Sequence, residues 1–297
     1  MAAEPVFIGI DGGASKTHVV ALDGVGRLIG EARGPAASLN GEAAPAWAAI
    51  QQSLAAIPAL DDLDIANAHV VIGIAGTEIT ATYRDFVAAA PRYASLHVCS
   101  DAHVACAGAH ALADGAIVSV GTGVVGFCRF DGQTARAGGW GFPHDDRGSG
   151  AWLGMEAVAH AFAAGDGRCR PDDLSRAVMT DFEADAAALS AWACHATSGD
   201  FARYARVVVA EAGNKTADAL LDTAAGHVAA VARALVGQRA DLALALMGGL
   251  AGVIAPRLPA DLRARLTACT HSAAFGAALM ARAAHGLSDG LSEEAAG

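Results

Sequence analysis

Short apolar, β-branched runs separated by turn residues open the chain and predict an antiparallel meander. The expected strands are 6–11, 18–23 and 26–34. A glycine-rich stretch, GIDGGASKT at 9–17, contains the turn between the first two strands. Alanine, leucine and tryptophan then recur at helical spacing, which predicts a helix from 40 to about 57 with Asn40 as its N-cap.

Strand and helix patterns then alternate. A buried strand at 69–75, a helix at 80–90 and a strand at 95–100 imply a sheet with parallel members. A helix opened by Asp101 follows, and the N-terminal pattern then returns as strands 116–121 and 124–130 around a Gly-Thr-Gly turn. Two glycine-turn hairpins, each leading into α/β structure, predict an internally duplicated architecture.

The remainder of the chain has mainly helical spacing. The expected helices are 149–164, 172–180, 183–195, 200–212, 216–236 and 272–285, with one strand at 242–247 before GGLAG. We therefore predict an N-terminal α/β domain, residues 1–112, and a C-terminal α/β domain with a helical insertion, residues 113–297. The last helix is expected to pack back on the first domain.

Composition limits the classes of partner. The chain has 297 residues, 54% of them hydrophobic, and a formal charge of −11 without a basic run, which argues against nucleic acid. There is no secretory pattern, and no apolar run approaches the roughly 20 residues of a spanning helix. We expect a cytoplasmic protein without a membrane partner. The six cysteines show no C-x-x-C spacing, so we expect reduced, structural thiols, and packing roles for nearby His97, His103 and His110.

The first glycine turn is not a P-loop, because Ser15 stands where a P-loop has glycine before Lys16-Thr17, and a strand pattern follows. A glycine hairpin can still bind phosphate. Gly12 and Gly13 allow close backbone approach, and the hydroxyls of Ser15 and Thr17 can donate hydrogen bonds.

Two further groups extend this chemistry. Asp11, at the end of the first strand, is placed to hold Mg²⁺ through water, and Thr122 is a second hydroxyl donor in the turn 121–123. Each hairpin alone is equally consistent with a plain turn. The pair together suits a nucleotide.

Six motifs, in order, resemble those of the BadF/BadG/BcrA/BcrD group of sugar kinase/Hsp70/actin-fold ATPases, and within it the N-acetylglucosamine and glucosamine kinases. They are GIDGGASKT, Ala75-Gly76, SDA at 100–102, VGTG at 120–123, GGWGFPHDDRGSGAWLG at 138–154 and MGGLAG at 247–252. The resemblance implies a two-domain α/β, actin-like (ribonuclease H-like) fold with an interdomain cleft that closes on a sugar and Mg·ATP.

The resemblance also implies roles for individual residues. Asp101 would be the general base that accepts the proton of the sugar 6-hydroxyl. The implied sugar-binding residues are Ser38, Asn40, Ala75, Gly76, Asp101, Thr122, Gly139, Trp140, Gly141 and Asp146, and we add Asp145 because of its charge. The implied nucleotide-binding residues are Gly12, Gly13, Ala14, Ser15, Lys16, Thr17, Gly121, Thr122, Gly123, Gly248 and Gly249, with the segment 273–277 at the adenosine end.

Spacing alone leaves other interpretations open. Asp101 could only cap its helix, Trp140 could be a core residue, and Asp145 and Asp146 could belong to a solvated turn. The chain also departs from the family. Ala14 and Ser15 replace a third glycine and a threonine, and Asp145-Asp146-Arg147 replaces Gly-Asp-Glu.

We predict ATP-dependent phosphorylation of D-glucosamine to glucosamine 6-phosphate, with ATP and Mg²⁺ as cofactors. The additional carboxylate of Asp145 would favour a substrate ammonium. N-acetylglucosamine is the alternative substrate. An activator-type ATPase would need cysteine spacing that the chain lacks, and a non-catalytic sugar sensor would not need Asp101. Alanine-rich faces between 183 and 236 belong either to the core or to a homodimer interface.

Overall fold

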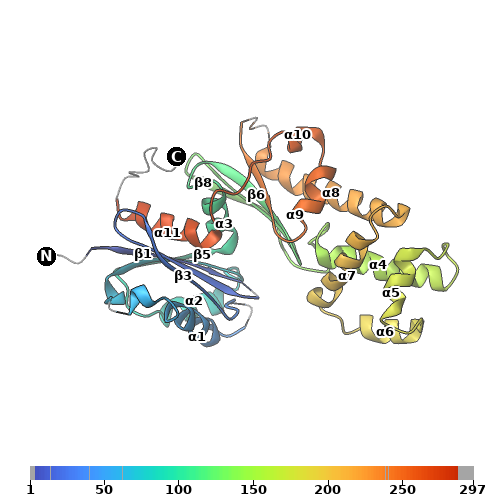
Figure 1. The fold of residues 1–297 in the computed structure, drawn as a ribbon, viewed down its shortest axis with the longest axis horizontal. Helices are drawn as coiled ribbons and strands as arrows, with labels where there is room; N and C mark the ends of the chain where they lie inside the picture. Colours follow the sequence, from blue (N-terminus) through green and yellow to red (C-terminus); the bar gives the residue numbers. More distant parts are fainter. Residues whose placement is uncertain are drawn as a thin grey trace. The chain divides into compact units, whose positions relative to one another are not determined.

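The computed structural model describes residues 4–13, 15–39, 41–61, 63–237, 239 and 241–286. They form two compact units (Figure 1). The first unit combines residues up to 114 with those from 269 onward, and the second comprises Gly115–Ala268. The final helix therefore belongs to the same unit as the first strand.

The first unit is built on a five-stranded sheet in the order β3-β2-β1-β4-β5. Its strands are β1 (Val6–Gly12), β2 (Thr17–Leu22), β3 (Leu28–Gly34), β4 (Ala68–Ile74) and β5 (Ser95–Ser100). The first three form the expected antiparallel meander, and β4 and β5 run parallel to β1. All five strands expected from the apolar pattern are confirmed within one or two residues.

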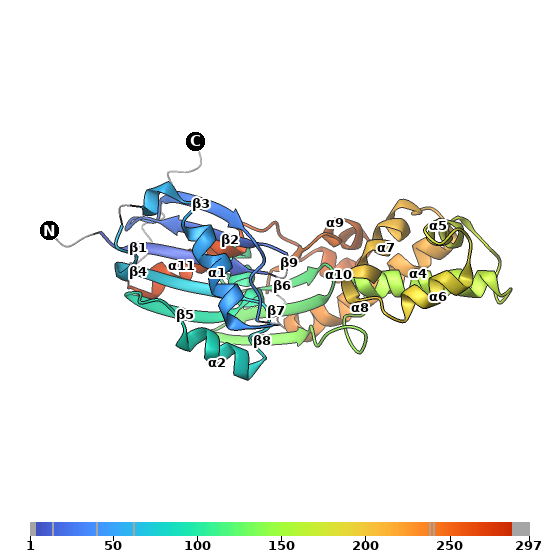
Figure 2. The same cartoon turned by 90° about the horizontal axis from the view of Figure 1, so that it is seen from below.

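Helices cover both faces of this sheet (Figure 1; Figure 2). Helices α1 (Ala43–Leu54) and α2 (Thr80–Ala88) lie on one face, and α3 (Asp101–Ala109) and α11 (Ala273–Ala284) lie on the other. Two 3₁₀ turns, Pro58–Leu60 and Ile65–Asn67, precede β4. The prediction of Asn40 as the N-cap of the first helix is wrong, since Glu42 holds that position without a side-chain hydrogen bond.

Helix α11 packs so closely on its neighbours that only glycine fits at the contacts. A Cβ atom added to Gly9 in β1 would lie 2.0 Å from the Ala274 carbonyl oxygen. A Cβ atom on Gly276 in α11 would lie 2.2 Å from the Gly108 nitrogen in α3. Backbone atoms cannot move aside as a flexible side chain can. The absence of a side chain at these two glycines therefore allows α11 to pack closely against β1 and α3.

The substitution Gly276→Ala is expected to lower the free energy of unfolding by about 3 kcal/mol or more, because the two helices must separate to admit the methyl group. Urea denaturation measures this loss. Gly226→Ala is the matched control, because Gly226 lies exposed within a helix and its Cβ would meet nothing within 4 Å. That substitution should stabilise the protein by roughly 0.5–1 kcal/mol. Equal effects of the two substitutions would contradict the packing argument.

The second unit repeats the pairing of the first in a four-stranded sheet ordered β8-β7-β6-β9. Its strands are β6 (Gly115–Val120), β7 (Val124–Phe130), β8 (Gln133–Gly138) and β9 (Leu244–Met247). The first three are antiparallel neighbours and β9 is parallel to β6, as in β3-β2-β1-β4. The predicted duplication is confirmed.

Strand β8 was not expected from the pattern. Its first four residues, 133–136, are all exposed, so the strand shows no alternation of apolar and polar residues. The local signal for it is the dipeptide Asp131-Gly132, whose φ angles of 49° and 71° form the two-residue turn typical of a tight hairpin.

The other elements of the second unit are helical. They are α4 (Gly150–Gly165), α5 (Asp173–Thr180), α6 (Ala186–Ala193), α7 (Ser198–Ala210), α8 (Lys215–Val236), α9 (Ala251–Ile254), the 3₁₀ turn Ala255–Arg257 and α10 (Ala260–Arg263). All five helices expected between 149 and 236 are present. The helix expected at 183–195 is shorter than predicted, and the short helices after β9 were not expected.

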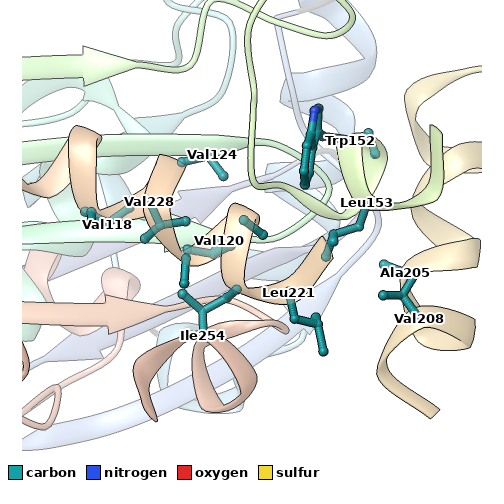
Figure 3. Packing of buried hydrophobic residues seen from close by; sticks show 14 of the residues in the cluster. Val118, Val120, Val124, Trp152, Leu153, Ala205, Val208, Leu221, Val228 and Ile254 are labelled. Atoms are coloured by element: carbon teal, nitrogen blue, oxygen red, sulfur yellow. The ribbon is translucent and has the colours of Figure 1, made fainter. Parts of the chain in front are cut away.

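Helix α8 forms the centre of the second core. It packs on β6, β7 and β8, and Figure 3 shows Leu221 and Val228 of α8 among Val118 and Val120 of β6 and Leu153 of α4. By length and composition α8 could cross a membrane, so the expectation that no apolar run reaches that length is wrong. Nine of its residues are buried in this core. The apolar stripes of α7 and α8 are therefore core, as one of the two interpretations held.

Asp172 joins three helices of this unit. Its carboxylate accepts hydrogen bonds from the Ser175 backbone N–H at the start of α5, from the Thr216 hydroxyl of α8, and from His160 of α4 at 2.8 Å. Partial burial alone would raise the pKa of Asp172, but these hydrogen bonds hold it well below its ordinary value. An ionised Asp172 therefore stabilises the helical part of the unit above acidic pH.

Candidate functional site

The carboxyl ends of three parallel strands bring the predicted residues of the first unit to one edge of its sheet. Asp11 in β1 is level with Gly73 in β4, which is level with Cys99 in β5. Gly12 ends β1 and Gly13 follows it, Ala75 and Gly76 follow β4, and Asp101 follows β5. Ligands of parallel α/β sheets bind at this kind of edge.

The first glycine turn is a tight hairpin followed by a strand, which confirms that it is not a P-loop. The Gly13 N–H donates to the Lys16 carbonyl, and Ser15 and Lys16 are exposed at the tip. Thr17 differs from the prediction. Its side chain is fully buried and its hydroxyl donates to the Pro35 carbonyl at 2.6 Å. Thr17 therefore stabilises the end of the turn from within the protein. Ala14 lies outside the described residues.

A segment after β3 returns to the same edge. The Ala37 N–H donates to the Gly13 carbonyl, and the Leu39 N–H donates to the Ala75 carbonyl. Ser38, between them, forms a parallel bridge with Ala75. The structure therefore brings Ser38 beside the turn and the Ala75-Gly76 dipeptide. Asn40 lies outside the part of the chain that the structure describes.

Asp101 is not the cap of its helix. Ser100 holds the N-cap position of α3, and its side chain accepts from the His103 N–H at 3.3 Å. Asp101 occupies the first helical position, where its Oδ1 accepts from the adjacent Ala102 N–H at 2.8 Å. The interpretation of Asp101 as the N-cap of its helix is therefore wrong.

Asp11 and Asp101 form an electrostatically coupled pair. Burial of Asp11 and the neighbouring Asp101 carboxylate raise the pKa of Asp11 to about 6, while the Lys16 ammonium partly offsets them. Two carboxylates held together in this way are stabilised in their ionised form by a divalent cation. Mg²⁺ in phosphoryl-transfer sites needs only one or two carboxylates besides phosphate and water. Asp11 is therefore chemically suited to hold it.

The corresponding edge of the second unit carries the second turn. The Gly121 N–H donates to the Gly123 carbonyl, and the first amides of α4, those of Gly150 and Ala151, donate to the Gly121 and Thr122 carbonyls. A Cβ atom on Gly248, after β9, would lie 2.4 Å from the Val120 carbonyl oxygen. Hydrogen bonds therefore join the turn to the start of α4, and the Gly248-Gly249 segment packs closely against the end of β6.

Asp146 supports this turn. It is nearly buried, and its carboxylate accepts from the Val124 N–H at 3.0 Å beside Gly123. Burial raises the pKa of Asp146 and the Asp145 carboxylate adds to the rise, whereas the Val124 hydrogen bond opposes it. The interpretation of Asp146 as part of a solvated turn is wrong.

The loop after β8 presents Trp140 to the outside. Trp140 is 77% exposed, so it is not a core tryptophan. Its backbone N–H donates to Asp145 Oδ2 at 3.0 Å, and the Arg136 guanidinium lies 5.3 Å from its ring centroid. Gly139 and Gly141, on either side, have φ angles of 75° and 100° that favour glycine. The loop therefore offers a flat aromatic face and a carboxylate within a few residues.

Comparison with known proteins agrees with this arrangement. The model of the BadF/BadG/BcrA/BcrD ATPase family matches residues 8–281. The chain belongs to this family. Glucosamine kinase GspK of Vibrio cholerae is 29% identical over 250 residues, covering 82% of this chain and 85% of the relative.

Solved structures confirm the actin-like kinase fold of this BadF/BadG/BcrA/BcrD-family ATPase. A proposed N-acetylglucosamine kinase from Chromobacterium violaceum superimposes with a TM-score of 0.86 at 35% identity, covering 93% of this chain and 98% of the other. A ROK hexokinase from Thermus thermophilus shares the fold at 18% identity, with a TM-score of 0.58 and coverage of 95% and 99%.

Three further observations concern this ATPase. Ala274 and Ala277 are fully buried against the sheet of the first unit, so these side chains pack and do not line an adenosine site. Among the described residues, no group of three or more His, Cys, Asp or Glu could hold a metal ion. Residue spacing did not reveal that Arg203 and Arg206 of α7 line a pocket together with Thr122. No short sequence motif could connect these arginines with Thr122, because they lie about eighty positions after it in the chain.

Proposed function

We propose that this ATPase transfers the γ-phosphoryl group of ATP to an amino sugar, with D-glucosamine as the preferred acceptor. The observation that carries the proposal is the Asp101 carboxylate, placed beside Asp11 at the carboxyl edge of the sheet while Ser100 caps the helix. The extensive similarity to a glucosamine kinase supports the substrate class.

In the proposed mechanism, Asp101 accepts the proton of the sugar 6-hydroxyl as that oxygen attacks the γ-phosphorus. Asp11 would hold Mg²⁺ through water, and the bound ion would neutralise charge on the phosphate oxygens. The backbone of the turns at 12–16 and 121–123 would bind the phosphates. Ser38, the Ala75-Gly76 dipeptide and the loop from Gly139 to Asp146 would orient the sugar.

N-acetylglucosamine is the second candidate acceptor, supported by the similarity to a proposed N-acetylglucosamine kinase. Initial rates of ADP release with Mg·ATP and glucosamine, N-acetylglucosamine, glucose or no sugar separate the candidates. Sugar-dependent ADP release with the highest kcat/KM for glucosamine supports the proposal. ADP release that is independent of sugar would indicate an activator-type ATPase, and nucleotide binding without any turnover would indicate a sensor.

The charge of Asp145 is expected to produce the preference for glucosamine. Asp145→Asn should lower the ratio of kcat/KM for glucosamine to that for N-acetylglucosamine by about tenfold, because a charge-assisted bond to the ammonium is lost. Asparagine keeps an oxygen that can accept from the Trp140 backbone N–H, so the loop is preserved. Asp145→Gly, which removes both interactions, serves as the comparison. An unchanged ratio in both variants would refute this role.

A further inference from the structure

A pocket of about 380 Å³ lies within the second unit, beside the second glycine turn. It is lined by Gly121, Thr122, Gly150, Gly249 and Leu250 and by Gly199, Ala202, Arg203, Ala205 and Arg206 of α7. Gly199, Ala202, Arg203 and Arg206 follow the spacing of neighbours on one helix face. One face of α7 therefore forms a wall of this pocket.

Small residues bring that wall close to the turn. A Cβ atom on Gly150 would lie 3.0 Å from the Gly121 carbonyl oxygen and 3.4 Å from the Ala202 Cβ. Thr122 is exposed, and among the described residues no backbone hydrogen bond uses the N–H of Thr122 or Gly249. Unused amides beside a glycine turn are typical of anion sites.

Arg206 differs from four other arginines of the same unit. Arg168, Arg176, Arg233 and Arg257 each pair with a carboxylate. Arg203 lies near Asp200, whose pKa is lowered chiefly by hydrogen bonds from Thr197 and further by the Arg203 charge, and the Arg203 guanidinium also hydrogen-bonds the Tyr204 side chain. Within the described part of the chain, the Arg206 guanidinium has no ion pair or hydrogen bond. An uncompensated cation therefore lines a pocket of a protein with a net charge of −11.

We propose that Arg206, assisted by Arg203, binds the polyphosphate of the nucleotide from the α7 side of this pocket. The inference rests on the proposed function and adds nucleotide-binding residues from the helical part of the unit. A guanidinium can donate two parallel hydrogen bonds to phosphate oxygens, and the turn amides approach from the other side. These residues set the affinity for the nucleotide, and the transfer step itself remains with Asp101.

Calorimetric titration with Mg·ADP and with adenosine tests the inference. Arg206→Ala should weaken Mg·ADP binding about 10- to 50-fold, as expected for loss of charge-assisted hydrogen bonds, and should leave adenosine binding unchanged. Arg206→Lys should recover part of the affinity. The dissociation constant of the Arg206→Ala variant should also depend less on salt concentration. Arg176→Ala, which removes an exposed arginine outside the pocket, should bind Mg·ADP within about twofold of the wild type.

The outcomes separate this inference from the proposed function. Unchanged Mg·ADP binding in both Arg206→Ala and the double variant Arg203→Ala/Arg206→Ala, with sugar phosphorylation intact, would overturn the inference alone. Equal weakening of adenosine and Mg·ADP would also overturn it, because it would show contact with the nucleoside. A wild-type protein that binds no Mg·ADP would overturn both proposals. Both arginines are exposed, so the variants are expected to fold.

Discussion

Asp101→Asn is expected to lower kcat for sugar phosphorylation by about 10²- to 10⁴-fold, the range typical of a lost general base. Asparagine has nearly the same shape, and its side-chain oxygen can still accept from the Ala102 N–H. Since Ser100 caps the helix, the substitution leaves the start of α3 intact. The KM values for ATP and sugar should change much less than kcat, and the coupled ADP assay measures both.

Ser100→Ala is the matched control for this experiment. It removes the cap of the same helix and should lower the free energy of unfolding by about 1 kcal/mol. Its kcat should remain near that of the wild type. If Asp101→Asn reduced stability and left kcat unchanged, Asp101 would be a structural residue and the proposed mechanism would fail.

The second large effect concerns Asp11. The value of kcat/KM for Mg·ATP should fall as the pH decreases through about 6, because protonation of Asp11 removes the charge that would hold Mg²⁺. Asp11→Asn should lower kcat/KM by about 10²- to 10³-fold, as expected for loss of a preorganised electrostatic group, and should abolish this inflection. A pH profile on both sides of the pKa of about 6 for Asp11 measures both effects.

The same shift predicts an opposite effect on stability. The folded-state pKa of Asp11 lies above its ordinary value of 3.8, so the folded protein favours the protonated form. The free energy of unfolding of the metal-free protein should therefore fall as the pH rises from about 4 through about 6. Asp11→Asn should make the protein more stable than the wild type at about pH 8. Asp85→Asn, at an exposed carboxylate of α2 in the same unit, should change neither profile.

Several parts of the candidate site follow from local sequence. Each glycine turn comes directly after a β-branched apolar run, and the strand pattern after Thr17 is enough to exclude a P-loop. The apolar runs that end at Asp11, Ala75 and Ser100 predict parallel strands, and strands of this kind place their carboxyl ends at one edge.

Other parts do not follow from local sequence. Whether Asp101 or Ser100 caps α3 depends on backbone geometry at one position. Thr17 and Asp146 face inward because the Pro35 carbonyl and the Val124 amide approach them from distant parts of the chain. Strand β8 has no apolar signature because four of its six residues are exposed at the edge of the sheet.

The sequence by itself determined the duplicated β-meander plan, the family and the residue types of the site, because these depend on short-range periodicity and on motifs a few residues long. Only the tertiary structure decided which of those side chains reach the site and which brace it, and that Arg206 lies in the pocket with Thr122. Contacts between residues tens of positions apart depend on how the helices and strands pack. A local pattern of side chains does not determine that packing.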